Sequence, residues 1–376
     1  MQRFDRYLFK NILIATVFVT IVLTAIVFLT QSLRFLELVI ESGASSLSFW
    51  VLTMLALPRF FEVIVPLATI AAVIFVYNRM CMDSEMVAIR SAGYSPFQIG
   101  RSAIVLSLLL TIFLYAMTMF AAPNALSQMN KMRKIIKSQY SNVLFREGVF
   151  NRIGDDFTVY IKDKNSEGEM AGLMIHDSRK NNKYPSTILA QKGIIISNDD
   201  TMQVVVYDGS RQEYNPEKQI LQNLNFERYV IDMPDSGPVA TRWREPDERT
   251  IIELFNPNEN NARDMESLRD FKVEIHKRFT NPLLVIGFTL IGIVAMLIGP
   301  VDRRGQGKRI IIAILCTLFI QGGYITAYNM ARNSDIGYIF MYALTLLPIA
   351  ITAFLMSGTS ENMRRSLLYQ NREKAL

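Results

Sequence analysis

The sequence predicts an α-helical membrane protein with six transmembrane helices, arranged three plus three around an inserted antiparallel β jelly-roll domain. Two observations predict this class. Apolar runs with few or no charges occur three times before a long polar stretch and three times after it, and short alternating apolar runs fill the middle of that stretch. A helix needs about 20 apolar residues to cross a bilayer core, and each of the six runs is long enough.

The six predicted spans differ in how free of charge they are. The second contains Arg59 and Glu62, which are three residues apart and therefore share one helix face. Two interpretations stay open for them, an ion pair near the membrane interface or a contact with a charged substrate. The first span is longer than the apolar part of a cleavable signal, so we expect it to remain as an anchor. The predicted spans are residues 11–33, 47–78, 102–130, 279–301, 310–331 and 336–360.

The orientation is predicted from the Lys and Arg residues of short loops, which are enriched on the cytoplasmic side of a membrane. The basic segments are the N-terminal one, the loops after spans two and four, and the segment after span six. They predict cytoplasmic termini and an external polar domain, which is periplasmic in a bacterial inner membrane. The basic residues are Arg3, Arg6, Lys10, Arg79, Arg90, Arg101, Arg303, Arg304, Lys308, Arg309, Arg364, Arg365, Arg372 and Lys374.

The polar stretch has the pattern of a β domain. Its short apolar runs alternate with turn-forming dipeptides, which is typical of an antiparallel β-sandwich or jelly roll. Residues 234–262 are polar and rich in Pro and Asn, and they are predicted to be a connector. The apolar runs are residues 157–161, 173–175, 194–196 and 202–207, and the turn signals are Asp208-Gly209 and Asn215-Pro216.

These features divide the chain into three predicted parts. Residues 1–135 hold the first three spans, with a cytoplasmic helix at residues 83–93. Residues 136–262 hold the β domain and its connector. Residues 263–376 hold the last three spans and the cytoplasmic tail.

The cytoplasmic helix is predicted from signals at its two ends. Asp83 or Ser84 is a suitable N-cap, and Gly93 is a suitable stop. Glu85 falls in the first turn, where the helix dipole favours a carboxylate.

One face of this helix is apolar, because Met82, Met86 and Ile89 recur at helical spacing. Two interpretations stay open. The helix either lies on the membrane surface, where Glu85 serves only the dipole, or docks into a groove on a nucleotide-binding subunit. In the second case Glu85 can pair with an Arg of that partner.

The sequence contains no pattern of catalytic or metal-binding residues. The motifs H-E-x-x-H and G-x-S-x-G and paired metal-ligand spacings are missing. His176 and His276 are isolated and are predicted to be structural, and Cys81 and Cys316 are predicted to be packing residues. Residues 305–309 resemble the end of a Walker A loop but join two membrane spans. We therefore expect no catalytic residue, no metal site and no cofactor on this chain; any ATP and Mg²⁺ would be bound by another chain.

The chain resembles the LptF/LptG family of lipopolysaccharide export permeases. The likeness rests on the three-plus-three layout, the external β domain, the opening Arg6-Tyr7-Leu8, and an acidic-Ser-Glu-hydrophobic run at residues 83–93 that closes on a Gly. Residues 274–278 and the basic loop 303–309 are more similar to LptF, whereas Gly299-Pro300 also occurs in LptG-like chains.

The resemblance implies a permease subunit of an ABC transporter that extracts lipopolysaccharide from the inner membrane and passes it to a periplasmic bridge. It implies as partners an LptG-like permease, a dimer of an LptB-like ATPase that uses ATP and Mg²⁺, and LptC- and LptA-like periplasmic proteins. It implies no binding to nucleic acid.

A second function stays open, that of a mechanotransmitting or sensor permease that relays a periplasmic signal. Such permeases typically have four spans, so six predicted spans argue against it. An intramembrane enzyme is disfavoured, because the spans are predicted to lack paired ionisable residues.

The resemblance also implies roles for individual residues. Glu85 matches the carboxylate that faces the ATPase, and Arg34 and Arg332 match basic positions near lipid phosphates. Arg binds phosphate in a bidentate manner, although the same residues can simply snorkel to the interface. The implied ATPase-coupling residues are Asp83, Ser84, Glu85, Met86, Ile89, Arg90 and Gly93. The implied lipopolysaccharide-binding residues are Arg34, Arg332, Arg59, Lys131, Arg133 and Lys134.

Overall fold

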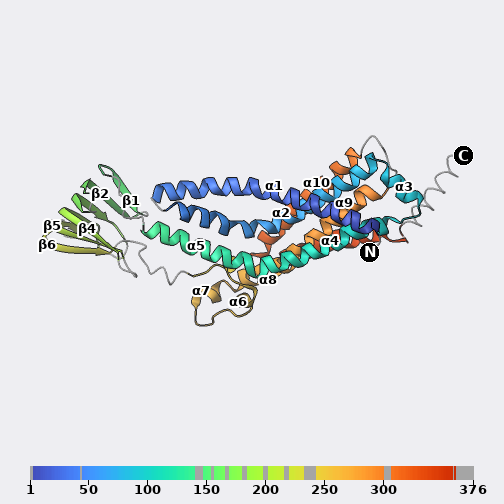
Figure 1. Ribbon diagram of the computed structural model, residues 1–376. Coiled ribbons are helices and arrows are strands. Elements are labelled where there is room, and N and C mark those ends of the chain that lie inside the picture. Colours follow the sequence, from blue (N-terminus) through green and yellow to red (C-terminus); the bar gives the residue numbers. More distant parts are fainter. Residues whose placement is uncertain are drawn as a thin grey trace. The chain divides into compact units, whose positions relative to one another are not determined.

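The computed structural model shows two compact units (Figure 1). The first comprises Met1–Gln31, Met54–Ser127 and Arg244–Leu376, and the second comprises Ser32–Thr53 and Gln128–Trp243. The residues that the structure describes are 3–42, 45–139, 147–153, 156–165, 169–179, 184–197, 202–215, 220–232, 243–299, 306–358 and 360.

Six helices of the described chain are long and apolar enough to cross a membrane, which confirms the six predicted spans. Three precede the β domain and three follow it. Most extend past the predicted limits, because the helical hydrogen bonding continues into the polar flanks of each apolar core. The helical segments are α1 (Arg3–Ser42), α2 (Ser46–Met82), α4 (Pro96–Ala116), η1 (Met117–Ala121), α5 (Ala122–Gln139), α8 (Leu268–Thr280), η4 (Asn281–Leu283), α9 (Leu284–Leu297), α10 (Gly307–Ala331) and α11 (Ile336–Met356).

The core of the first unit is built around α9, which packs against α4, α10 and α11. Phe288 and Ile293 of α9 are fully buried, and so are Leu8 and Ile12 of α1. Gly292 allows a close approach to α2, since a Cβ at this position would lie 3.1 Å from a methyl carbon of Val73.

Four of the membrane helices contain a proline or a turn that departs from regular α-helical geometry, and in α11 this residue is Pro348. Pro58 and Pro66 lie inside α2, where each lacks the N–H group that an α-helix would use. The third span passes through the π-helical segment η1, and the fourth passes through the 3₁₀ turn η4, which contains Pro282. Single π-helical turns are frequent at functional sites.

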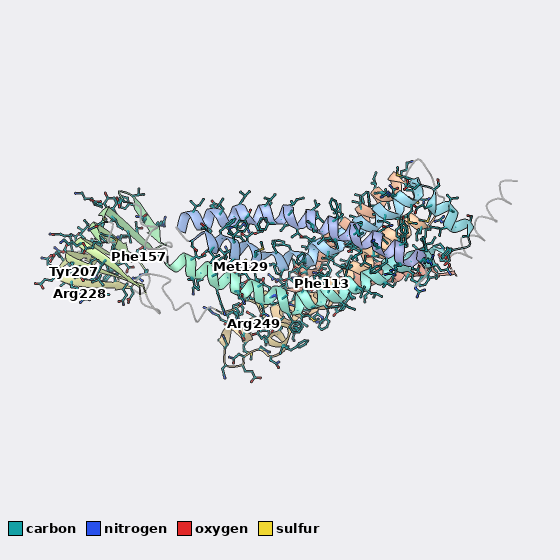
Figure 2. The ribbon with its side chains drawn as sticks, in the orientation of Figure 1. Phe113, Met129, Phe157, Tyr207, Arg228 and Arg249 are labelled. Atoms are coloured by element: carbon teal, nitrogen blue, oxygen red, sulfur yellow. The ribbon has the colours of Figure 1, made fainter. Side chains whose placement is uncertain are left out.

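Residues 243–266 are folded, although the sequence predicted a connector that runs to residue 262. They form η3 (Pro246–Glu248), α6 (Ile251–Phe255) and α7 (Ala262–Glu266). Arg249, labelled in Figure 2, donates two hydrogen bonds of 2.9 and 2.7 Å to the buried carboxylate of Asp264. This bidentate ion pair links the two short helices, and such a long-range pair leaves no periodic signal in the sequence.

The β domain is a single six-stranded antiparallel sheet in the order β1-β2-β3-β4-β5-β6 (Figure 1). The prediction of an inserted antiparallel β domain is confirmed. Each described strand pairs with its neighbours in sequence, so these strands form a meander, without the Greek-key crossovers that define a jelly roll. The strands are β1 (Phe150–Ile153), β2 (Phe157–Lys164), β3 (Met170–Asp177), β4 (Ser186–Ser197), β5 (Met202–Asn215) and β6 (Ile220–Asp232).

The four apolar runs predicted as strands all fall within strands β2 to β5. The predicted turn at Asp208-Gly209 is wrong, because both residues lie inside β5. Asp208 has a φ of 50°, which is the left-handed conformation that turn residues favour. The Asp-Gly dipeptide therefore marks a local distortion within a strand and not a turn between two strands. The predicted turn at Asn215-Pro216 extends beyond the described residues after Asn215.

The pairing ladder of the sheet is interrupted along one line across five described strands, which we call the crease. The pairs on either side of this line form in one constant register, but the residues on it are not paired. Buried side chains on the two sides of the crease are three residues apart, as with Met170 and Leu173, and not two. The crease consists of Lys162, Gly172, Gln191, Asp208 and Glu227.

Candidate functional site

The segment predicted to couple to an ATPase contains the short helix α3 (Glu85–Ser91), which begins two residues later than predicted. Ser84 occupies the N-cap position but has a φ of 61°, and its side chain makes no capping hydrogen bond. Asp83 instead lies 3.5 Å from the Nε atom of Arg79. The predicted side-chain cap is therefore wrong, because Ser84 has a left-handed backbone conformation and Asp83 pairs with Arg79.

The predicted stop at Gly93 is confirmed by the geometry of the C-terminus. Gly93 has a φ of 89°, and its N–H donates to the carbonyl of Arg90 over 3.0 Å. The N–H of Tyr94 donates to the carbonyl of Ile89 over 3.4 Å. These two bonds form a Schellman motif, which requires a residue that tolerates positive φ at the position of Gly93.

The helix α3 has an inward and an outward face. Met86 is fully buried in the core of the first unit, and Ile89 packs against that core. Met82 is 56% exposed, so the prediction that it shares the apolar face is wrong. The outward face carries the exposed residues Val87, Ala88 and Ser91.

Glu85 opens α3 and is half-buried. Within the part of the chain that the structure describes, its carboxylate makes no ion pair. A carboxylate without a counter-charge, beside an outward face of small side chains, suits a surface that receives a basic partner.

Arg90 points in the opposite direction, toward α9. Its Nη1 donates to the carbonyl of Gly299 over 3.0 Å, and its Nη2 donates to the carbonyl of Leu297. Burial lowers the pKa of Arg90 from its usual value. Such a guanidinium satisfies carbonyl groups that remain free at the end of a helix.

A cluster of charged side chains lies inside the first unit, where α2 meets α8. The Nζ atom of Lys277 lies 3.4 Å from Glu62 and 3.6 Å from Glu274. Arg278 pairs with Glu274 over 3.2 Å, and Asn281 donates to Glu62 over 3.2 Å. We call these five residues the charged cluster.

The charged cluster changes the interpretation of the two charges in the second span. Arg59 lies 3.4 Å from Asp247 of η3, and Glu62 pairs with Lys277. The predicted pair between Arg59 and Glu62 is therefore not formed. The guanidinium of Arg278 also donates to the carbonyl groups of Pro246 and Asp247, so η3 is fixed to α8.

A cavity of about 30 Å³ lies next to the charged cluster. Four members of the cluster line it, together with Thr118 of the π-helical segment η1 and the pair Arg59 and Asp247. The four members are Glu62, Glu274, Lys277 and Arg278. Two buried polar atoms there, Nη1 of Arg278 and Oδ1 of Asp247, have no hydrogen-bond partner among the residues that the structure describes. A cavity of this size holds one or two water molecules, which typically satisfy such groups.

No role for Lys277, Glu274 or Asn281 was predicted from the sequence. A usable signal was present, since charges at spacings of three and four directly precede an apolar run that needs partners for them. Tyr328 of α10 completes the environment of Lys277, whose Nζ lies 5.4 Å from the centre of its ring.

The basic residues implied to bind lipid fall in both units. Arg332 lies in the first unit, where it donates to the hydroxyl of Tyr328 over 3.1 Å and lies 3.8 Å from Asp270. The hydrogen bond to Tyr328 raises the pKa of Arg332 above its usual value. Arg59 also lies in this unit and is paired with Asp247.

The remaining implied residues lie in the second unit. Arg34 is exposed on α1 and makes no ion pair with any residue that the structure describes. Lys131, Arg133 and Lys134 lie on α5, and the first two are exposed. Arg34 is therefore available to an anionic ligand, whereas Arg59 and Arg332 already have partners.

The second unit also contains a pocket of about 700 Å³ at the crease of the sheet. Its lining is mostly apolar and includes Tyr160, Met174, Leu189 and Phe226. The charged side chain of Lys162 also lines it. Figure 2 labels Tyr207 and Arg228, which pair across β5 and β6 directly beside the crease.

Six membrane-length helices, an inserted antiparallel sheet and a short helix between two spans define a multi-span membrane protein with an inserted extramembrane domain. Residues 6–358 match the family described as lipopolysaccharide export system permease LptF/LptG. The chain belongs to this family, whose members are non-catalytic permease subunits of the inner membrane.

Individual relatives are similar at low identity, two of them over most of the chain and one over about half of it. The uncharacterized protein RP871 of Rickettsia prowazekii (strain Madrid E) is 25% identical over 358 residues, which cover 94% of this chain and 97% of the relative. The lipopolysaccharide export system permease protein LptG of Escherichia coli (strain K12) is 22% identical over 318 residues, or 82% and 85% of the two chains. LptG of Haemophilus influenzae is 25% identical over 175 residues, or 46% and 48%. The Escherichia coli and Haemophilus influenzae relatives are named LptG, while the family description covers LptF and LptG together.

Proposed function

We propose that this chain is the membrane subunit of an ABC transporter that extracts lipopolysaccharide from the inner membrane, driven by a separate ATPase dimer. Membership of the export permease family supports the substrate class. The observation that carries the ATPase partnership is the geometry of α3. Its inward face is anchored by Met86, and its outward face and Glu85 remain available to a partner.

In this proposal both termini and α3 are cytoplasmic, and the β domain is periplasmic. The coupling segment 83–93 docks on an LptB-like ATPase, which binds ATP and Mg²⁺. A second, LptG-like permease completes the transporter. Glu85 pairs with a basic residue of the ATPase, and charge-assisted hydrogen bonds of this kind are among the stronger polar contacts.

The lipid path in this proposal uses surfaces of both units. Arg34 contacts the phosphates of the lipid, with Lys131, Arg133 and Lys134 as further basic contacts. Arg332 and Arg59 can contribute only by exchanging their present acidic partners. The apolar pocket at the crease receives part of the lipid before it passes to LptC- and LptA-like proteins.

The experiment is purification of the tagged full chain in mild detergent, followed by mass spectrometry of the proteins and lipids that accompany it. We expect an ATPase, a second six-span permease and lipopolysaccharide. A chain that purifies without lipid and with a periplasmic signalling protein would support the alternative, a sensor permease. A chain that purifies alone would contradict the transporter.

A further inference from the structure

One side chain of the helix α3, that of Arg90, donates hydrogen bonds to the C-terminal half of the chain. We propose that Arg90 is the positioning residue that transmits the movement of α3 to α9. This inference rests on the proposed function, in which α3 is the element that the ATPase moves. The two hydrogen bonds of Arg90 reach Leu297 and Gly299, which follow it by 207 and 209 residues.

The geometry of these bonds suits the transfer of a displacement. Arg90 presents a rigid planar fork, and two of its nitrogen atoms bind two carbonyl groups at one helix end. The last carbonyl groups of a helix lack partners within the helix and carry the negative end of its dipole. A guanidinium at this place is therefore attracted by the negative end of the helix dipole and oriented by its two hydrogen bonds.

The side of α3 that carries Arg90 is also its buried side. Met86, four residues earlier, is fully buried in the core of the first unit. Two fixed points one helical turn apart prevent α3 from rotating independently of the bundle. A push on the outward face at Val87 and Ala88 is thus delivered to the end of α9.

From α9 the connection continues to the charged cluster. The chain runs from α9 back through the 3₁₀ turn η4 into α8, which carries Lys277 and Glu274. Lys277 holds Glu62 of α2. A shift of α9 along its axis therefore acts on the contact between α8 and α2, next to the π-helical segment of the third span.

Arg79 provides a matched control for Arg90. It has the same side chain and lies at the end of α2, close to α3. Its side chain is 73% exposed, and its ion pair is to Asp83, only four residues away. Removing Arg79 deletes a positive charge from the same region and leaves the link to α9 intact.

The test compares Arg90→Ala, Arg90→Lys and Arg79→Ala in the complete complex with its ATPase, reconstituted in liposomes that contain lipopolysaccharide. Three quantities are measured: ATPase bound per permease, ATP hydrolysed, and lipid transferred per ATP to a soluble acceptor. We expect both Arg90 variants to bind the ATPase and hydrolyse ATP normally. Lipid transferred per ATP should fall by about tenfold, which is within the range that single side chains contribute to coupling between sites. Arg90→Lys should fail because an ammonium group cannot reproduce the two-pronged contact.

Equal lipid transfer per ATP in Arg90→Ala and wild type would overturn this inference. It would also be overturned if loss of bound ATPase accounted for the whole loss of transfer, since Arg90 would then be a docking residue. Thermal unfolding of each variant separates misfolding from uncoupling, and Arg90→Lys keeps the charge if Arg90→Ala does not fold. A wild-type protein that recruits no ATPase would refute the proposed function itself, and this inference with it.

Discussion

The Nζ atom of Lys277 lies 3.4 Å from a carboxylate oxygen of Glu62, and this contact joins the two halves of the chain within the membrane-spanning helices. Both side chains are mostly buried. A buried ion pair is stabilising only if its remaining polar atoms are also satisfied. Asn281 donates a hydrogen bond to Glu62, and Glu274 forms a second ion pair with Lys277. The cluster is therefore sensitive to the loss of any one member.

Replacing Lys277 by Met should destabilise the protein by about 3–5 kcal/mol, because Glu62 is left as a buried charge without its partner. Thermal or denaturant unfolding of the detergent-solubilised protein would measure this change. The double variant Glu62→Gln/Lys277→Met should be less unstable than Lys277→Met, since it removes the orphaned charge. A double variant that is less stable than the single one would contradict the assigned pairing.

Replacing Arg249 by Met should cost about 3–5 kcal/mol, because Asp264 is almost fully buried and depends on its two hydrogen bonds. Arg249→Lys should also be destabilised, since Lys cannot form the bidentate contact. Hydrogen exchange in residues 246–266 would report the loss locally. The exposed pair Arg269 and Asp335 is the control, and breaking it with Arg269→Gln should leave that exchange unchanged.

Replacing Gly209 by Ala should destabilise the β domain by about 1–3 kcal/mol, a typical cost of overpacking. The new Cβ would lie 2.3 Å from the carbonyl oxygen of Leu189 and 2.6 Å from the ring of Phe226. Amide exchange in β4, β5 and β6 of the full chain should become faster. Ser210→Ala, at the next position, should exchange like the wild type. Equal exchange in both variants would show that β5 tolerates a side chain at position 209, next to the crease.

Reversing the charge of Glu85 with Glu85→Lys should reduce the amount of ATPase that copurifies, because like charges then face each other across the docking surface. Glu259→Lys is the matched control, since it makes the same charge change at an exposed carboxylate outside the segment 83–93. Pull-down of the ATPase followed by measurement of ATP-driven lipid release would check this. Unchanged recruitment and release in Glu85→Lys would remove Glu85 from the docking surface.

Replacing Arg34 by Glu should lower the yield of crosslinks between this chain and lipopolysaccharide, because a carboxylate repels the phosphates. A photoreactive residue placed on α1 close to position 34 would capture the lipid. Arg34→Lys should retain most of the yield, since it keeps the positive charge. Equal crosslinking of Arg34→Glu and wild type at equal expression would exclude the phosphate contact.

The membrane helices and the inserted β domain could be predicted because each leaves a local signal in the sequence. Six apolar runs give six helices, and four alternating runs fall in four strands. The stop at Gly93 was also local, since only a few residue types tolerate its positive φ. β6 was missed because it lies at the edge of the sheet, where most of its side chains are exposed and the alternation is weak.

The partners of the buried charges could not be predicted, because they come from distant parts of the sequence. Glu62 is nearer in sequence to Arg59 than to any other cation, yet it binds Asn281, 219 residues away, and Lys277. Periodicity places both Arg59 and Glu62 on one face of α2 but does not show what covers that face. The crease was not predicted either, because the dipeptide Asp208-Gly209 within it and beside it has the composition of a turn.

The sequential order of the six strands affects how the β domain is made. Synthesis proceeds from the N-terminus, and each strand from β2 onward finds its partner already present on the preceding segment. Short loop closures of this kind carry a small entropic cost and favour rapid folding. The sheet can therefore grow by one strand at a time, before α8 to α11 exist. At each stage the newest strand offers a single fresh edge, and the next strand of the same chain covers it.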